Sequence, residues 1–165
     1  MKLNIFKTFI IGLAFFTISL AWTVYNNYVP YFLNGLIGSS TVVGIIMTLD
    51  NMFGIIFQPF FGKRSDTTKS KFGRRMPYLL VGIPLSALFF MLVPYYDKFG
   101  GSIFNFDLRL VVLMLFVILM NFFMSVYRAP AVALMPDATH PGQRSSANGI
   151  INAMGGLGSI IAFIV

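Results

Sequence analysis

The sequence predicts an all-α membrane protein, and three observations carry this prediction. Hydrophobic residues make up 57% of the 165 residues and charged residues 10%, whereas about 25% charge is usual in a soluble domain. The hydrophobic residues form long runs, each close to the roughly 20 residues that a helix needs to cross a bilayer. Basic residues flank these runs, so we interpret the net charge of +7 as a signal of membrane topology and not of nucleic-acid binding.

About five apolar segments are long enough to form transmembrane helices. We expect these helices at residues 6–28, 41–61, 77–96, 110–136 and 146–165. The first segment shows no clear cleavage site after its apolar core, so we favour a spanning helix over a signal peptide. The last apolar run reaches residue 165 without a loop or a charged stop. We therefore expect an N-terminal part of a larger bundle, with a missing C-terminal half as its partner.

A basic run at residues 62–75 sets the expected orientation of the spans. It holds six of the chain's twelve Lys and Arg residues, and such residues resist translocation across a membrane. We therefore expect this run and the N-terminus to be cytoplasmic. Segment 97–109 carries two acids and two bases and is expected outside. The sequence has no cysteine, which excludes disulfides and thiolate metal sites, and we expect no metal and no cofactor.

The second span carries an acid, Asp50, near its middle. A carboxylate at that depth costs at least about 2.5 kcal/mol, so it is rarely incidental. At 100° per residue, Asn51 and Gln58 share the face of Asp50, and this face is expected to look at a partner helix or an aqueous cavity. Asp50 is then either a protonatable or cation-binding group on a polar route through the bilayer, or a buried carboxylate held by a neighbouring helix.

Two further polar features lie inside the spans. Asn26 and Asn27 lie near the end of the first span and face either a water-filled cavity or a packed helix. Arg128 lies in the fourth span, about eight residues or 12 Å before Asp137, and an arginine at that depth needs an acid or a cavity. The alternative for Arg128 is that its long side chain reaches the cytoplasmic surface.

The basic run has a recognisable spacing, Gly62-x-x-x-Asp66 followed by Gly73-Arg74-Arg75. It resembles the loop motif that joins the second and third helices of major facilitator superfamily transporters. The longer form in this chain is similar to the bacterial sucrose-type branch, solute carrier family 45, and to the glycoside-pentoside-hexuronide cation symporters. Segments 50–62, 127–137 and 144–152 extend the similarity over nearly the whole chain. Thr67 stands where an arginine commonly follows the aspartate, so the usual pairing with that arginine is not expected.

The resemblance implies a partial N-terminal six-helix half of the major facilitator superfamily fold, in a multi-pass protein of the cell inner (cytoplasmic) membrane. It implies symport of a sugar with H⁺ or Na⁺ by alternating access. Asp50 and Arg128 would be the coupling residues. The residues expected to bind the sugar are Asn26, Asn27, Asn51 and Gln58. The residues expected to form a cytoplasmic gate motif are Gly62, Asp66, Gly73, Arg74, Arg75 and Asp137.

Two other functions stay open at this point. The 19 phenylalanines suit efflux of a drug or amphipathic solute on the same fold, and a short chain also suits a non-transporting membrane subunit. An enzyme is not expected, because the sequence shows no nucleophile-base pair, metal-ligand cluster or phosphate loop. Ser65-Asp66, for example, has no histidine nearby in the sequence.

Overall fold

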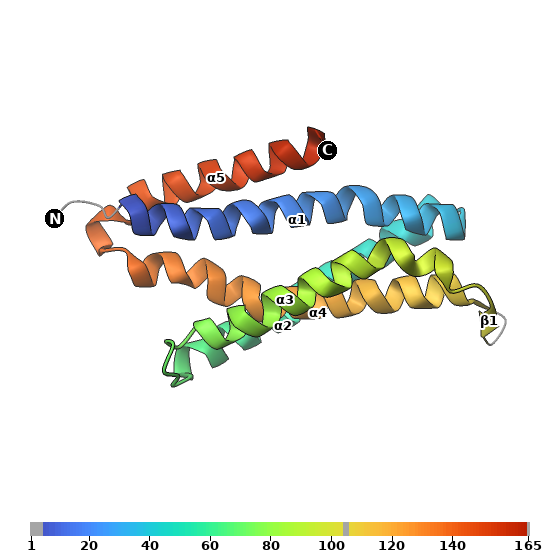
Figure 1. Ribbon diagram of the computed structural model, residues 1–165, viewed down its shortest axis with the longest axis horizontal. Helices are drawn as coiled ribbons and strands as arrows, with labels where there is room; N and C mark the ends of the chain where they lie inside the picture. The colour runs from blue at the N-terminus through green and yellow to red at the C-terminus, as the bar shows by residue number, and fades with distance from the viewer. Residues whose placement is uncertain (1–4, 104–105, 165) are drawn as a thin grey trace. The chain divides into compact units, whose positions relative to one another are not determined.

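The computed structural model describes the backbone of residues 5–103 and 106–164 (Figure 1). Within these ranges, the side chains of residues 7, 49, 50, 102, 103 and 106 lie outside the description. The elements in chain order are α1 (Ile5–Ile37), α2 (Ser40–Thr67), α3 (Met76–Leu92), the 3₁₀ helix η1 (Val93–Lys98), β1 (Ser102–Ile103), β2 (Phe106–Asp107), α4 (Leu108–Ala138), the 3₁₀ helix η2 (Pro141–Gln143) and α5 (Arg144–Ile164).

Five helices in the described part of the chain are long and apolar enough to cross a membrane. They are α1, α2, α3 together with η1, α4, and α5 together with η2. The expectation of an all-α protein with about five spans is confirmed, because one short hairpin is the sole strand pairing among the described residues.

Two helices run well past the ends that the sequence suggested. α1 continues to Ile37 with Pro30 inside it, and α2 continues to Thr67 with Pro59 inside it. Proline is tolerated in such helices because neighbouring groups satisfy the backbone atoms that it frees. α1 ends where the Gly38 amide donates to the Asn34 carbonyl at 2.8 Å, with Gly38 at φ +68°, a left-handed conformation that favours glycine. The connection to α2 is therefore only two residues long.

The connection between α3 and α4 is more ordered than a plain loop. After η1 the chain forms an antiparallel hairpin in which Ser102 pairs with Asp107. The Asp107 carboxylate accepts a hydrogen bond from the Arg109 amide at 2.9 Å, which caps the start of α4. The Arg109 side chain also pairs with Asp97 across 3.1 Å. The acids and bases of this segment thus include one ion pair, which agrees with its lack of net positive charge.

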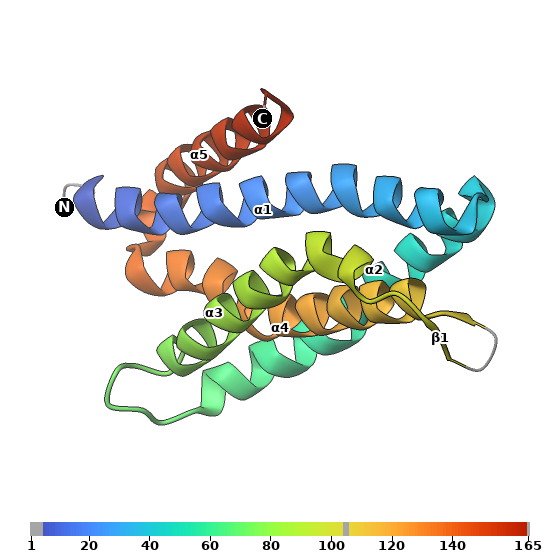
Figure 2. The ribbon, with the colours of Figure 1, turned by 45° about the vertical axis from the view of Figure 1, so that its right-hand side comes forward.

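The chain divides into two compact units, which are described separately. The first comprises Met1–Asn27 and Pro130–Val165. Within it, α5 lies beside the first half of α1 in both Figure 1 and Figure 2. The two helices approach closely through small residues: a Cβ added at Gly155 would lie 3.0 Å from the Ser19 hydroxyl, and one added at Gly158 would meet the backbone of Phe16. Small residues permit this approach where the hydrophobic effect no longer drives helix association.

The second unit comprises Tyr28–Ala129 and contains α2, α3 and most of α4. Aromatic rings join these three helices. Phe57 of α2 meets Phe122 of α4 edge to face with centroids 5.4 Å apart, and Phe89 of α3 stacks on Phe123 of α4 at 5.7 Å. Offset and edge-to-face pairs each add about 0.5–1.5 kcal/mol beyond the area that they bury. This packing holds α2 and α3 against α4 and so positions the connection between α2 and α3.

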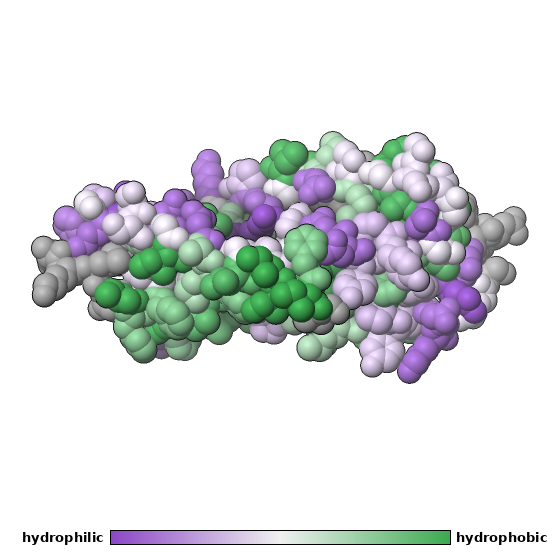
Figure 3. Space-filling model, turned by 90° about the horizontal axis from the view of Figure 1, so that it is seen from above, coloured by the Kyte–Doolittle hydropathy of each residue, from purple (hydrophilic) through white to green (hydrophobic). Residues whose placement is uncertain are grey.

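Apolar side chains also cover large areas of the surface, and they form continuous patches on the face drawn in Figure 3. Such exposure is costly in water but favourable against lipid or further helices. Strongly exposed examples occur on three helices: Phe6 on α1, Ile55, Ile56 and Phe60 on α2, and Leu157, Ile160, Phe163 and Ile164 on α5.

Candidate functional site

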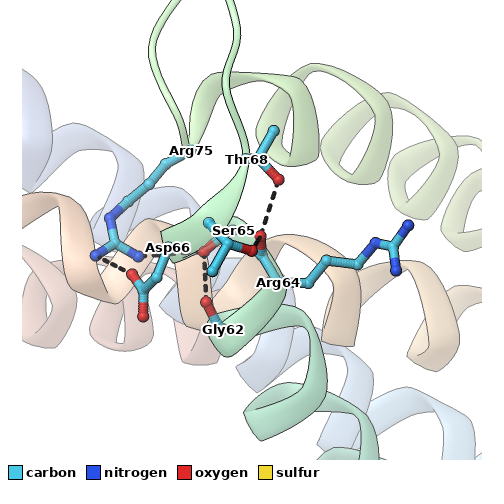
Figure 4. Close-up of polar contacts among 7 residues, drawn as sticks. Gly62, Arg64, Ser65, Asp66, Thr68 and Arg75 are labelled. Atoms are coloured by element: carbon cyan, nitrogen blue, oxygen red, sulfur yellow. Dashed lines mark hydrogen bonds and ion pairs between the residues drawn. The ribbon is translucent and has the colours of Figure 1, made fainter.

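The clearest polar site in the described structure lies where α2 ends and α3 begins (Figure 4). Asp66 and Ser65 come from the last turns of α2, and Arg75 immediately precedes α3. The Arg75 side chain reaches back to Ser65 and Asp66. The site therefore connects two successive spans through side chains as well as through the chain itself.

Side-chain hydroxyl groups bond to backbone carbonyls in the last turns of α2. The last carbonyls of a helix have no partner in the helix backbone and need other donors. The Ser65 hydroxyl donates to the Gly62 carbonyl at 2.7 Å, and the hydroxyls of Thr67 and Thr68 donate to the Arg64 carbonyl at 3.0 and 2.8 Å. This run of hydroxyl residues explains why α2 extends as far as Thr67 before the chain turns.

A tight turn then reverses the chain. The Gly73 amide donates to the Ser70 carbonyl at 3.1 Å, and the Phe72 amide donates to the Ser70 hydroxyl at 3.3 Å. Gly73 has a φ of +100°, a backbone conformation that residues other than glycine rarely adopt, so glycine is required there. A hydrogen bond of 2.8 Å between the hydroxyls of Thr68 and Tyr78 joins the start of this loop to α3.

The guanidinium of Arg75 is the centre of the site. Its Nη2 lies 2.8 Å from Asp66 Oδ1, and its Nη1 donates to Ser65 Oγ at 3.2 Å. Arg75 is 8% exposed and Ser65 is fully buried, whereas the Asp66 side chain is 54% exposed. The planar fork of arginine suits two acceptors at once. Because water reaches Asp66, we take the ion pair to contribute about 1 kcal/mol or less, as solvent-exposed pairs usually do.

The remaining residues of the gate motif are spread more widely. Gly62 faces α4, where a Cβ added to it would lie 3.5 Å from the Ala129 Cβ, an ordinary contact. Arg74 is exposed, and Gly73 forms the turn. Asp137 is also exposed, near the end of α4, and belongs to the first unit, whereas Asp66 and Arg75 belong to the second.

The expected coupling residues both lie in the second unit. Asp50 is part of α2, and its side chain lies outside the described residues. Arg128 is half-buried in α4, just before Pro130. Their roles remain predictions.

The expected sugar-binding residues lie in different units. Asn26 and Asn27 are exposed in the first, and the Asn26 amide donates to the Trp22 carbonyl at 2.8 Å. In the second, Asn51 is exposed and its amide donates to the Met47 carbonyl at 2.9 Å, while the Gln58 amide lies over Gly54. These contacts stay within single helices and do not by themselves define a sugar site.

One polar residue of the site was missed from the sequence. Ser65 was considered only as a nucleophile without a base, yet its hydroxyl lies between α2 and Arg75. A small hydroxyl residue three positions after Gly62 is the one signal that could have identified it. Elsewhere, Asn121 and Ser125 of α4 are buried. The Ser125 hydroxyl donates to the Asn121 carbonyl at 2.9 Å, and the Asn121 amide donates to the Val117 carbonyl at 3.1 Å. In the described part of the chain, no group of three acids or histidines could hold a metal ion.

Long apolar helices joined by a basic, ion-paired connection define the class: a multi-pass helical membrane protein. The chain belongs to the Major Facilitator Superfamily, whose family model matches residues 11–165. This confirms the resemblance seen in the loop motif and places the chain in a family of transporters and not of enzymes.

Curated relatives refine the comparison. The chain is 30% identical over 122 residues to a sucrose transport protein of Arabidopsis thaliana, an alignment that covers 67% of this chain and 20% of that protein. It is 28% identical to an uncharacterized symporter of Synechocystis, covering 84% of this chain and 26% of the relative. It is 24% identical to a general alpha-glucoside permease of Schizosaccharomyces pombe, covering 90% of this chain and 28% of that protein. The chain thus spans between a fifth and three tenths of these relatives' length. No solved structure gives a significant match.

Proposed function

We propose that this chain forms part of a sugar symporter that couples uptake to H⁺ or Na⁺ and works by alternating access. One observation carries the proposal: the relatives that match 67–90% of this chain include a sucrose transport protein, an alpha-glucoside permease and a symporter. The gate motif, Gly62 to Arg75 with Asp137, supports it through the contact between Asp66 and Arg75.

The proposed location is the cell inner membrane, with the N-terminus and the connection between α2 and α3 in the cytoplasm. Exposed bases lie at the end of α2 (Lys63 and Arg64) and on that connection (Lys69 and Lys71), which favours the cytoplasmic side. In the connection between α3 and α4, Arg109 is paired with Asp97, which favours the opposite side.

In the proposed mechanism, Asp50 binds the coupling ion, with H⁺ favoured. Arg128 assists release, because a cation that approaches a carboxylate competes electrostatically with a bound cation or proton. Asn26, Asn27, Asn51 and Gln58 donate and accept hydrogen bonds to sugar hydroxyls near the middle of the membrane, where transporter sites usually lie.

The gate motif controls access from the cytoplasm. Asp66 and Arg75 join α2 to α3, so these two spans move as one piece while that contact holds. Arg74 and Asp137 supply further charges on the same proposed side of the membrane. Rigid-body motion of this kind, about a fixed binding site, is the usual form of alternating access.

The test uses the complete protein that contains this chain, reconstituted in vesicles under an imposed pH or Na⁺ gradient. Uptake of radiolabelled disaccharides and monosaccharides identifies the sugar and the ion. Asp50→Asn is expected to abolish accumulation against a gradient and to spare exchange of bound sugar. Asp97→Asn, which changes an exposed acid of the connection between α3 and α4, is the matched control and should accumulate sugar normally. Full gradient-driven uptake by Asp50→Asn would refute the coupling role.

Efflux of an amphipathic solute has less support. It was favoured by the number of phenylalanines, but many of these rings are used in packing between helices. The phenylalanines that contact rings of another helix include Phe57, Phe61, Phe89, Phe122 and Phe123. A non-transporting subunit is disfavoured by membership of a transporter family.

A further inference from the structure

We propose that the connection between α2 and α3 is a binding surface for anionic phospholipid headgroups, and that Phe72 enters the membrane interface beside them. We call residues 68–75 the α2–α3 loop. The inference rests on the membrane placement proposed above, but it concerns a lipid ligand and does not depend on which solute is carried.

The structure separates the basic residues of this region into two groups. Arg75 is withdrawn from solvent and paired with Asp66, which is the single acid in residues 62–75. The other five basic side chains are exposed, namely Lys63, Arg64, Lys69, Lys71 and Arg74. The five exposed bases therefore share this surface with one half-exposed acid, Asp66, whose charge is paired with Arg75, and the net charge of the surface is positive. Clusters of four to eight basic residues next to a membrane span are typical of sites for anionic lipids.

The second observation is the position of Phe72. Its side chain is 74% exposed and lies between the two flanking spans, outside both of them. It lies next to Lys71 in the turn that Gly73 closes with φ +100°. An aromatic ring beside lysines is characteristic of segments that lie in the interface, where the ring contacts acyl chains and the ammonium groups contact headgroups.

The loop is also held in place before any ligand arrives. The Thr68 hydroxyl bonds to Tyr78 at its start, and Arg75 bonds to Asp66 and Ser65 at its end. Both flanking helices have the length and composition of membrane spans, so their ends place the loop at the membrane surface. A loop fixed at both ends loses less conformational entropy on binding.

These features favour lipid over a soluble acidic protein segment. Positive charge alone suits either ligand. The exposed Phe72 ring between the bases, at the level of the membrane surface, adds an apolar contact that a bilayer provides continuously.

The experiment measures lipid association with the complete protein in phosphatidylcholine nanodiscs. The readout is the preference for spin-labelled phosphatidylglycerol over spin-labelled phosphatidylcholine at low ionic strength. The double variant Lys69→Gln/Lys71→Gln should lower this preference by about fivefold for each lysine removed. The matched variant Lys69→Arg/Lys71→Arg keeps both charges and should behave like the wild type. Lys98→Gln removes an exposed charge from η1 and should also leave the preference unchanged.

Two further measurements separate the apolar contribution of Phe72 from the electrostatic contribution of the lysines. Phe72→Ser should weaken association of phosphatidylglycerol, whereas Phe72→Leu should retain most of it, because the contact is apolar and not specific for an aromatic ring. In about 1 M salt the difference between the wild type and the glutamine variant should disappear, since the screening length falls to about 3 Å. All of these residues are exposed, so the variants should fold, and their thermal stability in detergent checks this.

Two results would overturn the proposal. The first is an unchanged preference in Lys69→Gln/Lys71→Gln, or an equal loss in Lys98→Gln, because either outcome removes the role of this loop. The second is loop-dependent binding of soluble polyglutamate without a loop-dependent lipid preference, which would assign the surface to an acidic protein. Failure of sugar uptake in vesicles would not alter the lipid result, so the two proposals fail independently.

Discussion

Replacing Gly158 with alanine tests the packing of α5 on α1. A Cβ at this position would lie 3.1 Å from the carbonyl carbon of Phe16 and 3.2 Å from its Cα, and it would also meet the Phe16 carbonyl oxygen. Those atoms belong to the backbone of α1, which cannot rotate away as a side chain can. The two helices must therefore separate to admit one methyl group.

Two other glycines in the same unit provide matched controls. A Cβ at Gly156 meets nothing within 4 Å, and one at Gly12 meets mainly the sulfur end of the Met154 side chain. Methionine is flexible and can move to another rotamer at small cost. The three substitutions add the same methyl group to the same pair of helices and differ only in what that group meets.

The expected magnitudes follow from these surroundings. Overpacking against a rigid neighbour costs about 1–3 kcal/mol, so Gly158→Ala should be less stable than Gly156→Ala by about that amount. Gly156→Ala should be neutral or gain up to about 1 kcal/mol, because alanine is the better helix former. Gly12→Ala should fall between the two. Destabilisation should therefore decrease in the order Gly158, Gly12, Gly156.

The assay is unfolding of the complete protein in mixed micelles by increasing SDS, followed by helical circular dichroism. The free energy of unfolding of each variant is compared with that of the wild type. If Gly158→Ala unfolds at the same SDS fraction as Gly156→Ala, the close approach of α5 to the α1 backbone is not a feature of the folded protein.

Further predictions concern the site between α2 and α3. Arg75→Lys should destabilise the protein by about 1 kcal/mol, because a single ammonium group does not reproduce the fork that contacts Ser65 and Asp66, and detergent thermal unfolding measures this. Ser65→Ala should cost a similar amount, and a loss no larger than that of Ser145→Ala, an exposed serine of α5, would contradict the bridging role. Thr68→Val and Tyr78→Phe should show a coupling energy of about 0.5–1.5 kcal/mol in a double-mutant cycle, and additive effects would show that their hydroxyls do not interact.

The class of this protein could be read from local patterns. Long apolar runs predict spanning helices wherever they occur, because the cost of placing peptide groups in lipid depends on composition and not on the partner. The boundaries were less predictable. The first two spans were expected to end at residues 28 and 61, yet α1 continues to Ile37 past Pro30 and α2 continues to Thr67 past Pro59, since membrane helices tolerate proline.

The site at the α2–α3 connection was also predicted in part from the sequence. The spacing from Gly62 to Arg75 was sufficient to indicate the family, and the family model confirms it. With Thr67 in place of the usual arginine, the sequence grouped Asp66 with Arg74 and Arg75 in one gate motif but did not say which arginine pairs with it. In the structure Arg75, nine positions later in the chain, pairs with Asp66, and Ser65 lies between the helix and the guanidinium.

The sequence by itself determined the all-α membrane class, the approximate spans and the family, because these depend on hydropathy and on spacing along the chain. Only the tertiary structure decided that Arg75 turns inward while Lys69, Lys71 and Phe72 stay exposed. The reason is physical. All of these residues lie in one short polar segment with similar local preferences, and their environments differ only after α2 and α3 pack together and the turn at Gly73 returns the chain to Asp66.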